Sequence, residues 1–65
     1  MNLKQTLEHL TMCKVYIDIG KECKVFNVSP YEARKALADD ELLKPVKSIF
    51  PCLNEFNDLC VVIEA

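Results

Sequence analysis

The sequence contains little that could perform catalysis or hold a cofactor. Its 65 residues include one histidine, one glycine and no tryptophan. There is no phosphate-binding loop, no closely spaced pair of metal ligands and no nucleophile beside an activating base, which are the parts that enzyme sites usually need. We therefore predict a protein that is not an enzyme and that uses no cofactor and no metal.

Long hydrophobic runs and an excess of positive charge are also lacking. No stretch approaches the roughly 20 apolar residues of a membrane span, and the segment Met1–Gln5 lacks the apolar core of a signal peptide. We expect a protein of the cytoplasm, of the producing or a host cell, without a membrane partner. The net charge is −2, whereas nucleic-acid binders concentrate positive charge, so direct binding to nucleic acid is not expected.

The chain length limits the size of the core. Hydrophobic residues make up 51% and charged residues 28% of the chain, which is a globular composition. A single domain over residues 1–65 buries only about 60% of the surface that its unfolded form exposes. We expect a stability on the order of a few kcal/mol, unless a partner or a second copy adds burial.

The first third of the chain predicts a helix and a strand. Leu3, Leu7 and Leu10 have the spacing of an amphipathic helix over residues 2–12, and Asn2 followed by Gln5 is a helix-start signal. Residues 13–19 alternate between apolar and polar side chains, which indicates a half-buried strand.

A second strand over residues 23–28 is expected to form a hairpin with the first. A three-residue loop over 20–22, with Gly20 supplying the unusual backbone angles, keeps the apolar side chains on one face. A two-residue loop would mix the faces. The preferred register gives four cross-strand pairs, Ile19 with Cys23, Ile17 with Val25, Asp18 with Lys24, and Tyr16 with Phe26.

Ser29 begins the strongest local signal for a helix. Its side chain can cap the first amides, Pro30 tolerates the first helical position, and Glu32 can reach back to the cap. The acidic cluster Asp39, Asp40 and Glu41 predicts either a second helix start or a solvated corner.

The last third of the chain is ambiguous over residues 46–55. We favour a strand over 47–52, at a sheet edge because of Pro51, paired with a well-covered strand over 59–64. The alternative keeps 46–55 helical. The predicted fold class is a small α+β domain with an antiparallel sheet of three or four strands and helices packed on it, in the order α-β-β-α-β-β or, alternatively, α-β-β-α-α-β.

The four cysteines are interpreted as reduced structural thiols. Cys13, Cys23, Cys52 and Cys60 include no closely spaced pair of the kind that zinc sites use. Cys52 and Cys60 could face each other across a second hairpin. His9 and Cys13 have helical spacing, but no third residue completes a nucleophile site.

Two surfaces are candidates for binding a protein partner. The first is the sheet face with Tyr16 and Phe26, flanked by Asp18 and Lys24, because aromatic residues ringed by charge are typical of interfaces. This face would be hidden if one helix covered each side of the sheet. The second candidate surface is the acidic corner formed by Asp39, Asp40 and Glu41.

We therefore expect a small non-enzymatic module that occludes a surface of a larger protein or ribonucleoprotein partner. In size, mild acidity and lack of catalytic groups the chain is similar in kind to the small inhibitors that phages encode against host defence, anti-CRISPR proteins among them. This likeness is one of type and involves no specific residue. Alternatives are a self-assembling homodimer and, less favoured, a cysteine-based metal or redox protein.

Overall fold

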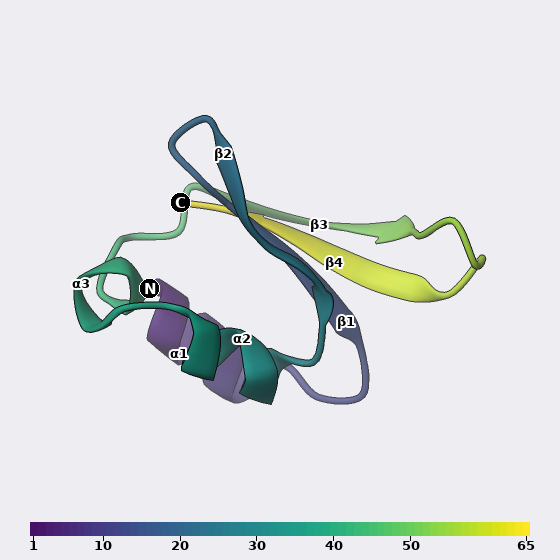
Figure 1. The fold of residues 1–65 in the computed structure, drawn as a ribbon, viewed down its shortest axis with the longest axis horizontal. Coiled ribbons are helices and arrows are strands. Elements are labelled where there is room, and N and C mark those ends of the chain that lie inside the picture. The colour runs from purple at the N-terminus through teal and green to yellow at the C-terminus, as the bar shows by residue number, and fades with distance from the viewer.

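A computed structural model describes residues 1–65 as three helices and one four-stranded sheet (Figure 1). The predicted α+β class is confirmed, and α3 is an additional short helix in the predicted order. The elements are, in chain order, α1 (Leu3–His9), β1 (Lys14–Ile19), β2 (Glu22–Val28), α2 (Pro30–Ala36), α3 (Asp39–Leu42), β3 (Ser48–Leu53) and β4 (Leu59–Glu64).

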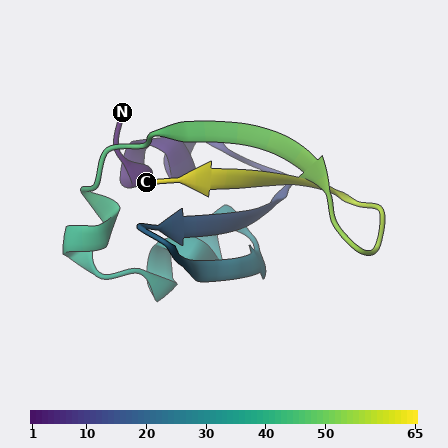
Figure 2. The ribbon, with the colours of Figure 1, turned by 90° about the horizontal axis from the view of Figure 1, so that it is seen from above.

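The sheet is mixed and not wholly antiparallel as expected. Its strand order is β2-β1-β4-β3, and the two hairpins join through a parallel pairing of β1 with β4 (Figure 2). As a result β2 and β3 run in the same direction. Parallel strands need a crossover connection, and here the segment with α2 and α3 supplies it. The sequence pattern shows strand positions but not this direction.

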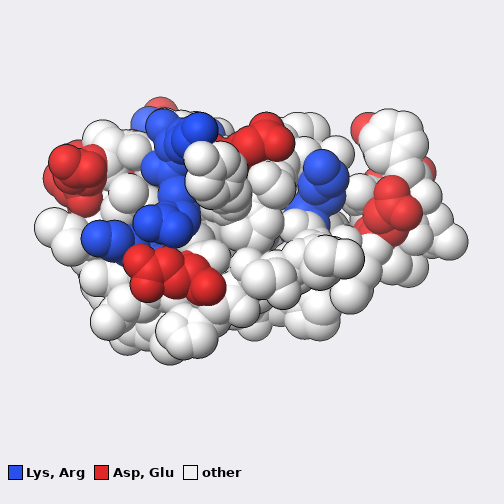
Figure 3. All heavy atoms as spheres, turned by 90° about the horizontal axis from the view of Figure 1, so that it is seen from below, with Lys and Arg blue, Asp and Glu red and all other residues white.

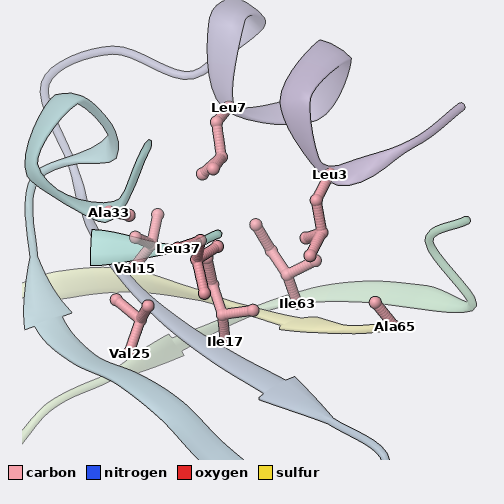
Figure 4. Close-up of a cluster of buried hydrophobic side chains, with 9 residues drawn as sticks. All are labelled: Leu3, Leu7, Val15, Ile17, Val25, Ala33, Leu37, Ile63 and Ala65. Atoms are coloured by element: carbon pink, nitrogen blue, oxygen red, sulfur yellow. The ribbon is translucent and has the colours of Figure 1, made fainter. Parts of the chain in front are cut away.

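Both α1 and α2 lie on the same face of the sheet, and the hydrophobic core is between them and the sheet (Figures 1 and 4). Only 12 of the 65 residues are buried, so the core is small and much apolar surface remains outside it. The arrangement with one helix on each face is therefore wrong, and the opposite sheet face has no helix over it. The core residues are Leu3, Leu7, Val15, Ile17, Val25, Ala33, Leu37, Ile63 and Ala65.

Helix α1 begins where the sequence predicts. The Asn2 side chain accepts a hydrogen bond from the Gln5 amide at 2.8 Å, and the Gln5 side chain accepts one from the Asn2 amide at 3.0 Å, which is a capping box. The helix ends at His9 and not at residue 12, because Leu10 is already extended and Met12 has a φ of 62°. The chain needs these residues to turn into β1.

The β1–β2 hairpin has a two-residue loop, so the predicted three-residue loop is wrong. Gly20 takes the first loop position with a φ of 66°. Two bulges in β2 restore the apolar face: Lys24 is an extra residue after the Asp18–Cys23 pair, and a second extra residue precedes Val28, next to Asn27 with its φ of 55°.

These bulges decide which predicted cross-strand pairs form. Ile17 does face Val25, and the rings of Tyr16 and Phe26 do meet. The predicted pairs of Asp18 with Lys24 and of Ile19 with Cys23 are wrong. The bulge places Cys23 opposite Asp18, and the shorter loop places Glu22 opposite Ile19.

Helix α2 has the predicted cap. The Glu32 amide donates to the Ser29 hydroxyl at 3.2 Å, and Pro30 occupies the first helical position. The Ser29 hydroxyl, and not its amide, contacts the Glu32 carboxylate, at 3.4 Å. The acidic cluster forms the start of α3, where the Glu41 carboxylate accepts from the Ala38 amide at 2.9 Å.

Residues 48–53 form the edge strand β3, so the preferred strand is confirmed and the helical alternative for 46–55 is wrong. Beyond the end of β3, the backbone N–H of Asn54 donates to the backbone carbonyl of Asp58 at 3.0 Å. Since hydrogen-bonded and non-hydrogen-bonded pairs alternate along an antiparallel ladder, Pro51 takes a position whose nitrogen faces away from β4. Its missing N–H therefore costs no hydrogen bond within the sheet.

Candidate protein interaction surface

The open face of the sheet carries one apolar side chain from each strand in a continuous row. Tyr16 of β1 is in register with Val62 of β4, which in turn pairs with Phe50 of β3. On the other side of Tyr16, the ring of Phe26 of β2 completes the row. We call Phe26, Tyr16, Val62 and Phe50 the aromatic row. The four residues come from distant parts of the chain and meet only because β1 pairs with β4.

The two rings at the β1–β2 end of the aromatic row contact each other edge to face. The ring centroids of Tyr16 and Phe26 are 4.9 Å apart with an interplanar angle of 76°, a geometry worth about 0.5–1.5 kcal/mol beyond the buried area. This contact fixes the Phe26 ring although 69% of the residue is exposed. A side chain that is held in place yet exposed loses little conformational entropy when a partner covers it.

Polar groups border the aromatic row on one side. Asp18 of β1 is in register with Glu64 of β4, which pairs with Ser48 of β3, and the Ser48 hydroxyl donates to the Glu64 carboxylate. On the other side, Lys14 is in register with Cys60, which faces Cys52. The row thus has carboxylates along one side and a single lysine at the other, as in an interface with a polar rim.

A shallow cavity of about 240 Å³ lies on the open face beside Tyr16. Its lining residues are Tyr16, Asp18, Cys23, Cys52, Leu53, Asn54, Cys60 and Val62. The side-chain Nδ2 of Asn54 donates to Oδ1 of Asn27 at 3.4 Å, which joins the end of β3 to β2 across this face. The cavity is smaller than the roughly 300–1,000 Å³ of typical small-molecule sites, so it suits one side chain of a partner better than a metabolite.

Two groups that line this cavity remain protonated at neutral pH. Burial, followed by the nearby Cys60 and Glu55, raises the pKa of the Tyr16 hydroxyl above 10.0. Burial also raises the pKa of the Cys23 thiol, and the Asp18 carboxylate adds to this. The Tyr16 hydroxyl is therefore available as a neutral hydrogen-bond donor to a partner.

The other sequence-predicted site residues lie away from the aromatic row. Lys24 pairs with Glu22 at 2.9 Å, and this hydrogen bond lowers the pKa of Glu22 and raises that of Lys24. Glu41 of α3 adds to the raised pKa of Lys24, so Lys24 lies on the α3 side. Asp39, Asp40 and Glu41 belong to the helix layer, and one flat partner surface cannot cover them together with Tyr16.

The helix side carries a groove of about 560 Å³ with charges of both signs (Figure 3). Its cations are already engaged in part: Arg34 lies 3.8 Å from the Glu8 carboxylate, and the Lys35 ammonium lies 4.4 Å from the centre of the Tyr31 ring. Asp39 also lines it. Such a mixed lining does not favour an anionic ligand.

The structure brings together one of the two cysteine pairs considered from the sequence. Cys52 faces Cys60 across β3 and β4 with their Sγ atoms 2.7 Å apart. His9 ends α1, and its Nδ1 donates to the Gln5 carbonyl at 2.7 Å, so it does not activate Cys13. No three histidine, cysteine or acidic side chains lie close enough to share a metal ion.

The β3–β4 hairpin carries exposed hydrophobic residues that the sequence analysis did not identify. It extends past the helix layer (Figures 1 and 2), and its large apolar side chains remain open to solvent. The run 59–63 predicts a well-covered strand, yet Leu59 is 61% exposed. The signal was the number of apolar residues between 49 and 63, which exceeds what two short helices can cover. The exposed residues are Ile49, Phe50, Leu53, Phe56 and Leu59.

Comparison with known proteins gives no further assignment. No protein family, curated protein or solved structure matches the chain. None of the three helices has the length and apolar character needed to cross a membrane. The function is therefore argued from the surface itself.

Proposed function

We propose that the protein is a non-enzymatic binding module that occludes a surface of a larger protein, alone or within a ribonucleoprotein, through the aromatic row. One observation carries the proposal: four side chains, one from each strand, form a continuous row on a sheet face that no helix covers, with Phe26 and Phe50 exposed at its ends and Tyr16 and Val62 half-buried between them. Such a module would be similar in kind to the small inhibitors that phages encode against host defence.

The size of the face fits a standard interface. Such an interface buries about 800 Å² of each partner, which is roughly a fifth of the 4404 Å² total accessible surface of this chain. One face of a four-stranded sheet can supply that area. Aromatic anchors near the centre and charged residues at the rim match the distribution of energy in measured interfaces.

The charges around the aromatic row favour a protein partner over a nucleic acid. Exposed aromatic rings on a sheet can also stack on bases, but proteins that do so add a positive groove that follows the phosphates. Here Asp18 and Glu64 border the row and Lys14 is the single cation in register with it. We expect a partner surface with apolar pockets and basic residues opposite the two carboxylates.

A homodimer that uses the same face is the alternative. Pairing through a sheet edge is disfavoured, because Pro51 removes an outward N–H from β3 and two bulges interrupt β2. Two copies can instead pack their aromatic rows against each other, face to face. Sedimentation of the pure protein at several concentrations distinguishes a dimer from a monomer that binds another protein.

The test compares single substitutions on the two sides of the molecule. Phe26→Ala and Phe50→Ala shorten the exposed ends of the aromatic row. Tyr31→Ala removes an aromatic residue of similar exposure, 63% against 69% for Phe26, from the helix layer, and serves as the matched control. Each variant is used as bait in a lysate of the native host, with circular dichroism and thermal melting to check that it is folded.

We expect the partner to bind the wild type and Tyr31→Ala but to be lost with Phe26→Ala and Phe50→Ala. Truncation of an interface anchor costs about 2 kcal/mol or more, which is roughly a 30-fold loss of affinity. A partner that binds both row variants normally and is lost with Tyr31→Ala would place the contact on the helix layer. If this chain chemically converts the bound partner or another substrate, the proposal that it is not an enzyme is wrong.

A further inference from the structure

We propose that Cys52 and Cys60 form a thiol–disulfide exchange site, at which a small-molecule disulfide such as oxidised glutathione converts the two thiols into one intramolecular disulfide. The reaction is reversible by small thiols. This proposal goes beyond the binding function and does not depend on it, because it concerns a pair of side chains whose chemistry can be measured without any partner.

The sheet register brings the two cysteines together. Cys52 is the direct cross-strand partner of Cys60 in the β3–β4 hairpin. Asn54 and Asp58 are hydrogen-bonded through their backbones, and every second pair along an antiparallel ladder is of this kind. Cys52 and Cys60 are two positions along, so they also form a hydrogen-bonded pair, for which the Cα atoms are about 5.5 Å apart. Disulfides form at Cα separations of about 4.4–6.8 Å. The Sγ atoms are 2.7 Å apart, so no strand has to move for them to bond.

The two thiols differ in their access to solvent. Both line the 240 Å³ cavity on the open face, but Cys52 is half-buried whereas Cys60 is 0% exposed. Burial first, and then the hydrogen bond to Cys52, raises the pKa of Cys60 to about 11. A buried protonated thiol is a poor nucleophile, so the external disulfide reacts at Cys52.

The reaction then proceeds in two balanced steps. The Cys52 thiolate attacks one sulfur of oxidised glutathione; the glutathione S–S bond breaks, a Cys52–glutathione bond forms, and one glutathione thiolate leaves and takes up a proton. Cys60 loses its proton to solvent and attacks Cys52 Sγ, which expels the second glutathione. The two protein thiols are oxidised to one disulfide, and one glutathione disulfide is reduced to two thiols.

The other two cysteines have no partner at comparable range. Cys23 lines the same cavity as Cys52 and Cys60, but its thiol donates to the Val25 carbonyl at 3.3 Å. Cys13 is near enough to add to the raised pKa of Cys60, but the only contact between two thiols is that of Cys52 with Cys60. An oxidant that acts on the folded protein should therefore produce the disulfide of Cys52 with Cys60 and no other. This selectivity separates a site formed by the fold from general thiol oxidation.

The test equilibrates the purified full chain with a glutathione redox buffer, blocks free thiols by alkylation and measures the intact mass. Cleavage after Glu55 separates Cys52 from Cys60 and locates the bond. The Cys13→Ser/Cys23→Ser double variant retains only the proposed pair. Cys52→Ser removes the attacking thiol and Cys60→Ala removes the resolving thiol. The same chain unfolded in urea shows that the buffer can oxidise all four cysteines.

We expect the wild type and the double variant to lose two hydrogens and to link Cys52 to Cys60 within one chain. Cys60→Ala should stop at a glutathione adduct on Cys52, and Cys52→Ser should gain no adduct at residue 60. The second step should accelerate about tenfold per pH unit below the pKa of Cys60, since the thiolate is the reacting form.

Four results would overturn the proposal. These are a wild type that stops at the glutathione adduct, a disulfide that involves Cys13 or Cys23, a bond between two chains, and four free thiols in a buffer that oxidises the unfolded chain. If Cys60→Ala does not fold, the wild type, the double variant and Cys52→Ser still decide between these results. None of them bears on whether the aromatic row binds a partner.

Discussion

The uncovered state of the β3–β4 hairpin can be tested by making the same substitution at two isoleucines. Ile17 of β1 is 0% exposed and Ile49 of β3 is 48% exposed, and both belong to the helix side of the sheet. Ile→Val removes one methylene without changing the β-branched shape. A larger truncation would be uninformative, since a chain of this length has a stability of about 3–10 kcal/mol and loss of a buried isoleucine to alanine costs about 2–5 kcal/mol.

The expected magnitudes follow from burial. At Ile17 the lost methylene is worth about 0.8 kcal/mol of transfer free energy, and the cavity left in the core brings the cost to about 1 kcal/mol. At Ile49 half of the transfer term applies and solvent fills the gap, so the cost is about 0.4 kcal/mol. For a domain of this size, the melting temperature should fall by about 4–8 °C for Ile17→Val and about 2–3 °C for Ile49→Val.

Urea unfolding followed by circular dichroism measures both free energies, and sedimentation shows whether the chain is monomeric under the same conditions. If Ile49→Val costs as much as Ile17→Val, the hairpin is covered in solution and the reasoning from exposure fails. A cost at Ile49 that decreases on dilution would identify a second copy as the covering surface. This result would favour a homodimer that covers the helix side of β3, and not one that uses the aromatic row.

Four further predictions test single features. Ser29→Ala should lower the stability by about 1 kcal/mol, measured by urea unfolding, because the Glu32 amide loses its acceptor; an unchanged unfolding midpoint would refute the cap. Gly20→Ala should cost about 1–2 kcal/mol from its φ of 66° alone, since no atom lies within 4 Å of the added carbon. Cys60 has its pKa raised to about 11 from 9.0, so above pH 9 the unfolded chain releases the proton first and the folded state loses stability up to about pH 11; Cys60→Ala should reduce this loss, and the raised pKa values of Cys23 and Tyr16 leave a remainder. Charge reversal at Asp39 and Asp40 should leave the dissociation rate of the partner unchanged in surface plasmon resonance, because these residues lie away from the aromatic row. A change in the association rate and in its salt dependence would show that the acidic corner takes part in binding.

The features that were predicted correctly depend on residues close together in sequence. A capping box requires only Asn2 and Gln5, three positions apart, and the Ser29 cap requires only the residues that follow it. Pro51 indicates an edge strand because its own nitrogen cannot donate. These effects act within one turn or one strand, so the pattern of residues is sufficient to find them.

The errors share a different cause. The three-residue hairpin loop was inferred from a regular ladder, in which a two-residue loop would mix the faces. The bulge at Lys24 removes that conflict by adding one residue to β2, and it also separates Lys24 from Asp18. A bulge is selected by how β1 and β2 pack beneath the helices, and no local signal in residues 20–28 identifies it.

The sequence by itself determined the α+β class, the starts of α1 and α2, the positions of the strands and the apolar face of the first hairpin, because capping and side-chain periodicity are local. Only the tertiary structure decided that β1 and β4 run parallel and that both helices lie on one face. These two facts place Phe26, Tyr16, Val62 and Phe50 in one row on a face that no helix covers. The contact of Cys52 with Cys60 depends only on the β3–β4 hairpin, so the sequence could suggest it. Contacts between distant segments depend on how all the elements fill a common core, and that competition cannot be read from any one segment.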